Sequence, residues 1–179
     1  VASTDYTGEM RLGQTILKGV VDSYRRIRNT LRFLLANTSD FSIEKDAVDV
    51  KDMLDIDRWA IARTAELQAE VIKLGDQYDF HTLVSQLHAF ASEDLGSFYL
   101  DILKDRLYTT KADSHPRRSA QTALWHITAT YLRLMAPVLT FTAEEAFAVF
   151  SPNKDGTIFT ETHHKLPEID GAEALLKRW

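Results

Sequence analysis

The apolar residues of this chain recur at intervals of three and four, the spacing that places side chains on one face of an α-helix. Within residues 13–36 the apolar members follow at intervals of four, four, three, four and three: Ile16, Val20, Tyr24, Ile27, Leu31 and Leu34. This stripe predicts one long helix over residues 13–36. The polar run at residues 37–40 predicts its end.

Two further helices are predicted from the same spacing and from acidic capping residues. Asp55 is placed to cap a second helix that continues to about Gln77. Asp79 is placed to cap a third helix that continues to about Tyr108, with residues 93–96 interrupting its pattern.

After a polar loop, Ser114 is placed to cap a fourth helix, and Pro116 is tolerated in its first turn. Pro137 should bend or end this helix. Thr142 and Glu145 form a capping box that predicts a short fifth helix over residues 142–150.

The remaining chain predicts less regular structure. Residues 157–160 suit a short extended segment, and residues 172–179 resemble the first turns of a helix. The pattern as a whole predicts an all-α fold, an antiparallel bundle of about five helices with a short irregular C-terminal appendage. We expect residues 1–12 to be a linker, 13–150 the bundle, and 151–179 the appendage with the start of a following helix.

Composition narrows the class of protein. The chain is 45% hydrophobic, enough for a packed core, and it contains no cysteine, which excludes disulfides and thiolate metal sites. No apolar run approaches the roughly 20 residues that a membrane helix needs. We therefore expect a cytoplasmic chain with no membrane partner. The N-terminus lacks the basic start and apolar middle of a signal peptide, and the absence of an initiator Met suggests an excised or processed piece.

Basic residues crowd the first predicted helix. At 100° per residue, Arg25, Arg28 and Arg32 fall within about 60° of one another, with Asn29 beside them. Guanidinium groups in such a row can bind phosphates bidentately or stack on exposed bases. The alternative is a solvated helix face with salt bridges to Asp22 and other carboxylates. The formal net charge of −5 argues against nucleic-acid binding by the whole surface and leaves room for a local basic patch.

A second basic group surrounds the loop between the third and fourth helices, and its members are Lys104, Arg106, Lys111, Arg117 and Arg118. In an up-down bundle this loop lies at one end, so both groups could frame one RNA-facing surface. The alternative is a structural role, in which these side chains form ion pairs with carboxylates such as Asp101 or Asp105.

The sequence carries no sign of a catalytic or metal centre. A Glu-x-x-His spacing occurs once, at Glu161 and His164, whereas carboxylate-bridged metal sites need it twice and on helices. Glycine-rich phosphate loops, nucleophile elbows and zinc-spaced cysteines are all missing from the sequence. We expect no catalytic residue and no metal ligand in this chain.

Several blocks of sequence closely resemble the anticodon-binding domain of bacterial isoleucyl-tRNA synthetases, in the order that this family has. The most specific is YRRIRNTLRFLLAN at residues 24–37, similar to the first helix of that domain. The other similar blocks are residues 1–6, 98–101, 104–108, 117–122 and 136–145.

The resemblance implies a function and a set of partners. The parent enzyme would activate isoleucine with ATP and Mg²⁺ and esterify tRNA(Ile), using catalytic and editing domains that lie upstream. Many bacterial members also carry a C-terminal zinc module. This chain would bind the anticodon stem-loop through Arg25, Arg28, Asn29 and Arg32, with Lys104, Arg106, Arg117 and Arg118 as further contacts, and would hold no cofactor itself.

Two other functions remain open at this point. The chain could be the equivalent domain of a valine, leucine or methionine synthetase, because amino-acid choice is made elsewhere in these enzymes. It could also be a non-catalytic helical bundle that binds proteins, a role that the negative net charge favours.

Overall fold

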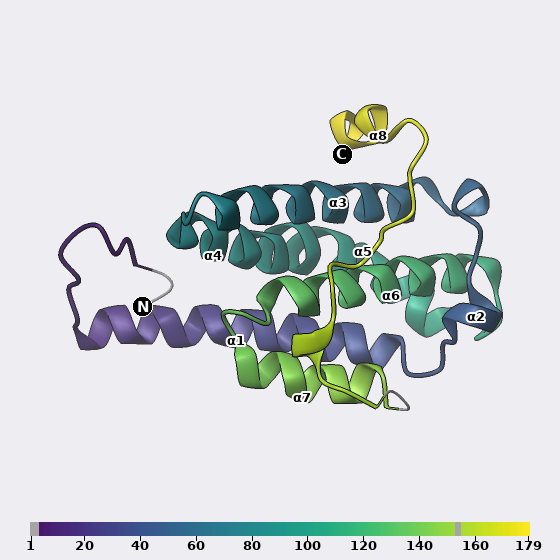
Figure 1. The fold of residues 1–179 in the computed structure, drawn as a ribbon. Coiled ribbons are helices and arrows are strands. Elements are labelled where there is room, and N and C mark those ends of the chain that lie inside the picture. Colours follow the sequence, from purple (N-terminus) through teal and green to yellow (C-terminus); the bar gives the residue numbers. More distant parts are fainter. Residues whose placement is uncertain (1–3, 153–154) are drawn as a thin grey trace.

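The computed structural model describes residues 4–152 and 155–179, and every regular element in that part of the chain is a helix (Figure 1). The longer elements are α1 (Gln14–Asn37), α3 (Asp55–Asp76), α4 (Phe80–Ala89), the π-helical segment η2 (Phe90–Tyr99), α5 (Leu100–Thr109), α6 (His115–Met135), α7 (Thr140–Phe150) and α8 (Ala172–Arg178). Three short elements complete the list: α2 (Ile43–Asp46), η1 (Val50–Asp52) and η3 (Ile158–Thr160). The predicted all-α bundle is confirmed, while α2 and η1 were not predicted.

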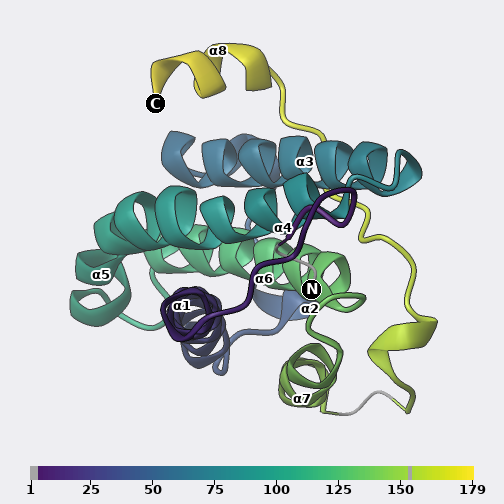
Figure 2. The same ribbon diagram turned by 90° about the vertical axis from the view of Figure 1, so that its left-hand side faces the viewer.

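The long segments run in alternating directions, as expected for an antiparallel bundle. In Figure 1, α1 and the continuous α4–η2–α5 segment run one way, and α3 and α6 run the other. Figure 2, which looks along α1, shows α7 beside α1 on the side of the bundle opposite to α3. The first turns of α1 extend beyond the other helices (Figure 1). Residues 1–3 of the predicted linker lie outside the described residues.

The core lies where α1, α3, α5 and α6 face one another. Leu34, Ile61, Leu103 and Ile127 come from these four helices, and none of them retains exposed surface. Burial of such a side chain stabilises the fold by about 1.5–3 kcal/mol. The C-terminal part of the predicted apolar stripe, Ile27, Leu31 and Leu34, therefore holds α1 against the bundle, whereas Ile16 and Val20 remain 47% exposed.

The predicted interruption at residues 93–96 is a π-helical stretch rather than a break. The backbone N–H of Leu100 donates to the carbonyl of Leu95, five residues earlier. A Cβ atom on Gly96 would lie 3.0 Å from the carbonyl oxygen of Ala91. That same carbonyl accepts a hydrogen bond of 3.0 Å from the Thr30 hydroxyl of α1. The π-helical stretch is thus fixed against α1, and the missing side chain at Gly96 permits it.

One predicted helix cap is confirmed and another is corrected. Asp79 caps α4, since its carboxylate accepts from the backbone N–H of Thr82 at 3.2 Å. Asp55 is the first residue of α3, and Leu54 occupies the N-cap position without a side-chain cap. The backbone N–H of Leu54 instead donates to the hydroxyl of Ser119 on α6 at 3.0 Å.

The two later caps are also corrected. Ser114 precedes α6 as predicted, but its hydroxyl donates to the carbonyl of Lys111 instead of capping the helix. Helix α7 begins at Thr140, so Thr142 lies inside it, and no capping box forms. The carboxylate of Glu144 accepts from the backbone N–H of Ile158 at 2.9 Å and so anchors η3. Residues 158–160 therefore form a 3-10 turn instead of an extended segment.

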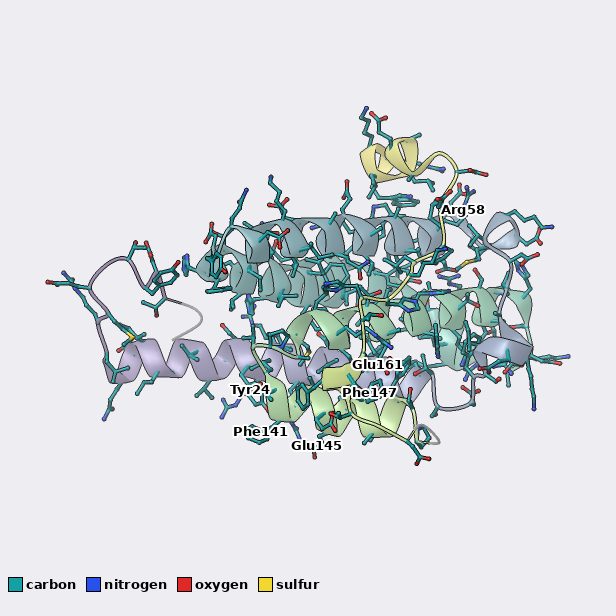
Figure 3. The ribbon with its side chains drawn as sticks, in the orientation of Figure 1. Tyr24, Arg58, Phe141, Glu145, Phe147 and Glu161 are labelled. Atoms are coloured by element: carbon teal, nitrogen blue, oxygen red, sulfur yellow. The ribbon has the colours of Figure 1, made fainter. Side chains whose placement is uncertain are left out.

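The segment between η3 and α8 crosses the bundle as an ordered strap, defined here as residues 161–171. Figures 1 and 3 show it passing over α6 and α3, with Glu161 at one end and Arg58 at the other. Arg133 pairs with Glu161 at 2.5 Å, and Arg58 donates to the carbonyl of Asp170 at 2.7 Å. The predicted appendage is therefore packed on the bundle. It ends in α8, whose Leu175 is buried against α3.

Candidate nucleic-acid interface

The face of α1 that points away from the core carries the first predicted basic group. Ile27 and Leu31 anchor the opposite face, with exposed fractions of 7% and 2%. Helical periodicity then directs Arg25, Arg28 and Arg32 to solvent, and all three are exposed.

These basic side chains differ in whether they have an ionic or hydrogen-bonding partner. Arg25 forms an ion pair with Asp22 at 3.3 Å, with both side chains largely exposed, which is a geometry of small energetic value. Among the residues that the structure describes, Arg28, Asn29 and Arg32 have no hydrogen-bonding or ionic partner. Their donor groups are therefore available to an external ligand.

Sequence reasoning overlooked one member of this face. Lys18 lies seven residues before Arg25 on the same helix and is exposed. Seven residues are almost two helical turns, so Lys18 continues the row toward the projecting end of α1. We call Lys18, Arg25, Arg28 and Arg32 the basic row. The periodicity that revealed the three arginines could have revealed the lysine as well.

Phe33, which follows Arg32 on α1, is half-buried and packs against the core. It therefore contributes to packing.

The second predicted basic group is largely occupied by carboxylates. Arg106 of α5 reaches Asp57 of α3, with Nη2–Oδ1 at 2.6 Å and Nη1–Oδ2 at 2.9 Å. Asp57 has no exposed surface and also accepts from the hydroxyls of Tyr99 and Ser119. Burial raises the pKa of the Tyr99 hydroxyl well above its ordinary value, and the Asp57 carboxylate adds to that effect. The phenol therefore remains a protonated donor.

Arg117 and Arg118, at the start of α6, form ion pairs with carboxylates in the segment that follows α1. Arg117 pairs with Asp40 at 2.9 Å and donates to a backbone carbonyl of α5. Arg118 donates to Gln121 at 2.8 Å and pairs with Asp46 at 3.4 Å. Both side chains are only 17% exposed. Any contact of Arg106, Arg117 or Arg118 with a nucleic acid would require them to leave these partners. Lys104 pairs with Asp101 at 2.7 Å, as considered above, and stays exposed.

The Glu-x-x-His residues face different partners. Glu161 pairs with Arg133, whereas His164 Nε2 lies 2.9 Å from His126 Nδ1 on α6. Burial lowers the pKa of both histidines to about 4, and the charges of His164 on His126 and of Arg133 on His164 act in the same direction. The pair is therefore neutral near pH 7 and fastens the strap to α6.

No helix in the described part of the chain is long and apolar enough to cross a membrane.

Comparison with known proteins gives one family and a consistent set of relatives. Residues 57–177 match the family described as the anticodon-binding domain of tRNA ligase. The isoleucine–tRNA ligases of Janthinobacterium sp. (strain Marseille) and of Paraburkholderia phymatum are each 60% identical to this chain, over 182 and 179 residues. That of Burkholderia vietnamiensis is 57% identical over 179 residues. Each alignment covers 100% of this chain and 19% of the relative, so the chain spans about a fifth of the length of these relatives.

Proposed function

This chain belongs to the anticodon-binding domain family of tRNA ligases, and we propose that it binds the anticodon stem-loop of tRNA(Ile) as part of an isoleucine–tRNA ligase. The assignment to isoleucine follows the names of its relatives. Their 60% identity favours that assignment over a valine, leucine or methionine enzyme. Family membership likewise favours RNA over a protein partner.

The observation that carries the proposal is the exposed basic row on α1. Arg28 and Arg32 are exposed and without partners among the described residues, so binding to phosphate costs them no existing ion pair. A guanidinium group can donate two parallel hydrogen bonds to one phosphate. Because charge interactions are screened over about 10 Å, this row can attract RNA although the formal net charge of the chain is −5.

The other predicted contacts receive different parts in this proposal. Asn29 can donate and accept hydrogen bonds, which suits the edge of an unpaired base. Lys104 and Arg25 would be secondary phosphate contacts, because each already has an exposed carboxylate partner. Arg106, Arg117 and Arg118 would act indirectly, by holding α5, α6 and the loop after α1 in place.

The chemistry of the whole enzyme would take place outside this chain. Relatives about five times as long carry the name isoleucine–tRNA ligase, and we propose that their ATP- and Mg²⁺-dependent reaction is located in the remainder. No cluster of three or more His, Asp or Glu in the described residues could hold a metal ion, so these residues do not fit a Mg²⁺ or Zn²⁺ site. We also propose a cytoplasmic location, where tRNA is charged.

The N-terminal part of α1 offers a surface for the catalytic and editing domains of such an enzyme. Ile16 and Val20 are each 47% exposed there, and together with Val84 and His88 of α4 they line a cavity of about 600 Å³. In a full-length ligase, the pair of changes Ile16→Glu and Val20→Glu should loosen this contact and lower the unfolding temperature. In the 179-residue chain the same changes should leave the unfolding temperature within about 2 °C. Equal effects in both proteins would remove this surface from the proposal.

Binding of the 179-residue chain to RNA hairpins tests the proposal directly. Fluorescence anisotropy would compare the anticodon stem-loop of tRNA(Ile) with that of another tRNA, for the wild type, Arg28→Ala and Arg32→Ala. Lys73→Ala is the matched control, because this exposed lysine lies on α3, on the far side of the bundle from α1. Loss of a base contact should cost about 1–3 kcal/mol and reduce discrimination, whereas loss of a phosphate contact should weaken both RNAs equally. Equal affinities for the wild type and both arginine variants would remove α1 from the interface.

A further inference from the structure

A cavity of about 580 Å³ opens at the C-terminal end of α1, where α1 and α7 meet α2 and α6. Figure 1 shows the ends of α1 and α7 on the same side of the molecule as α2. The cavity is lined by two kinds of side chain. The aromatic side chains of Phe41, Trp125 and Phe150 form one part, and the polar side chains after α1 form the other.

The polar side chains of this cavity present acceptors. The hydroxyls of Thr38 and Ser39 each donate to a backbone carbonyl of α1 at 2.9 Å. The hydroxyl of Ser42 donates to the carboxylate of Glu44 at 2.8 Å. Backbone and Ser42 hydrogen bonds lower the pKa of Glu44, so it is ionised near pH 7. Since each hydroxyl proton is already used, the oxygens of this cavity can only accept, and they favour a ligand that donates.

The aromatic part of the cavity is suited to a flat ring. The ring centroids of Trp125 and Phe150 are 5.6 Å apart and the planes are inclined by 40°. Trp125 is only partly buried, and its indole N–H has no hydrogen-bond partner among the described residues. Stacking of one base on an aromatic side chain is worth about 1–3 kcal/mol.

The basic row runs directly to this cavity. Leu35 of α1 lines it, and Arg28, seven residues earlier, lies on the same face of the helix. Arg32 precedes Leu35 by three residues, about 4.5 Å along the helix axis. An RNA backbone held by Arg28 and Arg32 would therefore bring a neighbouring base to the mouth of the cavity.

We propose that this cavity receives one unstacked base of the bound RNA loop and prefers a base that carries an amino group. The inference rests on the proposed RNA-binding function and adds a site and a preference to it. Adenine, cytosine and guanine all present amino donors. Uracil presents two carbonyl acceptors and one N–H, so it would turn acceptors toward the acceptors of Ser39 and Glu44.

A set of RNA hairpins with one stem and a loop of uridines tests this preference. Each hairpin replaces one loop uridine by adenosine, cytidine or guanosine, and the dissociation constant for the 179-residue chain is measured for each. One loop position should show binding that is about tenfold tighter with an amino base. At that position, 2-aminopurine should lose fluorescence on binding, because it stacks against Trp125.

The variant Glu44→Met separates this site from general RNA binding. Glu44 is exposed, so the change should not affect folding, and it removes the ionised acceptor. The loss of charge alters the affinity of every hairpin alike. The relevant readout is therefore the ratio of the dissociation constants for the all-uridine loop and the amino-base loop. In Glu44→Met this ratio should fall to near one. Glu93→Met, which changes an exposed carboxylate on η2, is the matched control and should keep the ratio.

The outcomes distinguish the two proposals. Hairpin binding that depends on Arg28 and Arg32 but shows no base preference at any position overturns the cavity proposal alone. A preference that persists in full in Glu44→Met overturns it as well. If no hairpin binds, both the cavity and the RNA-binding function are wrong.

Discussion

Arg106 holds the carboxylate of Asp57 through two hydrogen bonds of 2.6 and 2.9 Å, although the two residues are 49 positions apart in sequence. Tyr99 and Ser119 donate to the same carboxylate at 2.8 and 2.6 Å. Helices α3, α5 and α6 and the segment η2 therefore meet at one buried charge. A buried carboxylate is tolerated when it is paired and fully hydrogen-bonded, and Asp57 satisfies both conditions.

Removal of Arg106 should therefore destabilise the fold strongly. Arg106→Met leaves the Asp57 carboxylate buried without its counter-ion, which should lower the free energy of unfolding by about 3–5 kcal/mol. Urea denaturation followed by circular dichroism measures this quantity. Lys104→Met, on the same helix, removes only the exposed pair with Asp101 and should cost less than about 1 kcal/mol. Similar losses for the two variants would show that the buried network is not a major source of stability.

Two glycine-to-alanine changes should have opposite signs. In α1, a Cβ at Gly19 meets no atom within 4 Å, so Gly19→Ala should stabilise the chain by about 0.5–1 kcal/mol. At Gly96 the new Cβ would lie 3.0 Å from the Ala91 carbonyl, which Thr30 holds in place. Gly96→Ala should therefore destabilise by about 1 kcal/mol or more. Thermal unfolding of both variants checks this, and a gain at Gly96 equal to that at Gly19 would contradict the role given to the π-helical stretch.

The pair of His126 and His164 should make stability depend on pH. Both pKa values fall from 6.5 to about 4 in the folded chain, so below pH 6.5 the unfolded chain binds more protons. The contribution of the pair is thus complete above about pH 6.5 and is lost as the pH falls toward 4. It should change the free energy of unfolding by about 1–2 kcal/mol per pH unit in that window, given 1.36 kcal/mol per proton.

Urea titrations at intervals between pH 7 and 5 would measure this dependence. The double change His126→Gln and His164→Gln should flatten it, because glutamine does not titrate. His163→Gln alters an exposed neighbour and should leave the slope unchanged. Parallel profiles for the wild type and the double variant would contradict a buried neutral pair.

The sequence could predict those features that depend on local spacing. The long helices follow from apolar periodicity, and the first prediction, residues 13–36, differs from α1 (Gln14–Asn37) by one residue at each end. Asp79 was identified as a cap because a cap needs only its own helix. The exposure of Arg28 and Arg32 could also be predicted from local sequence. Once the apolar residues of a helix face the core, residues on the opposite face must point to solvent.

Features that depend on distant residues could not be predicted. In the sequence, Arg106 and Arg28 both look like exposed arginines on a helix. Only the fold brings Asp57 next to Arg106. Thr142 and Glu145 were expected to form a capping box, but α7 begins earlier, and its Glu144 instead accepts from the backbone N–H of Ile158 in η3. The cavity at the end of α1 combines Ser39 and Glu44 with Trp125, some 80 residues away, so no local pattern marks it. RNA contact by any of these residues stays a prediction.

The salt dependence of RNA binding tests the role of the basic row most directly. The dissociation constant of the 179-residue chain for the tRNA(Ile) anticodon stem-loop would be measured over a range of KCl concentrations, for the wild type and for the double variant Arg28→Ala, Arg32→Ala. Two lost phosphate contacts should reduce the slope of log K against log [KCl] by about 1.4–1.8, since each contact adds about 0.7–0.9. An unchanged slope together with an unchanged affinity would contradict the proposal that α1 holds the RNA.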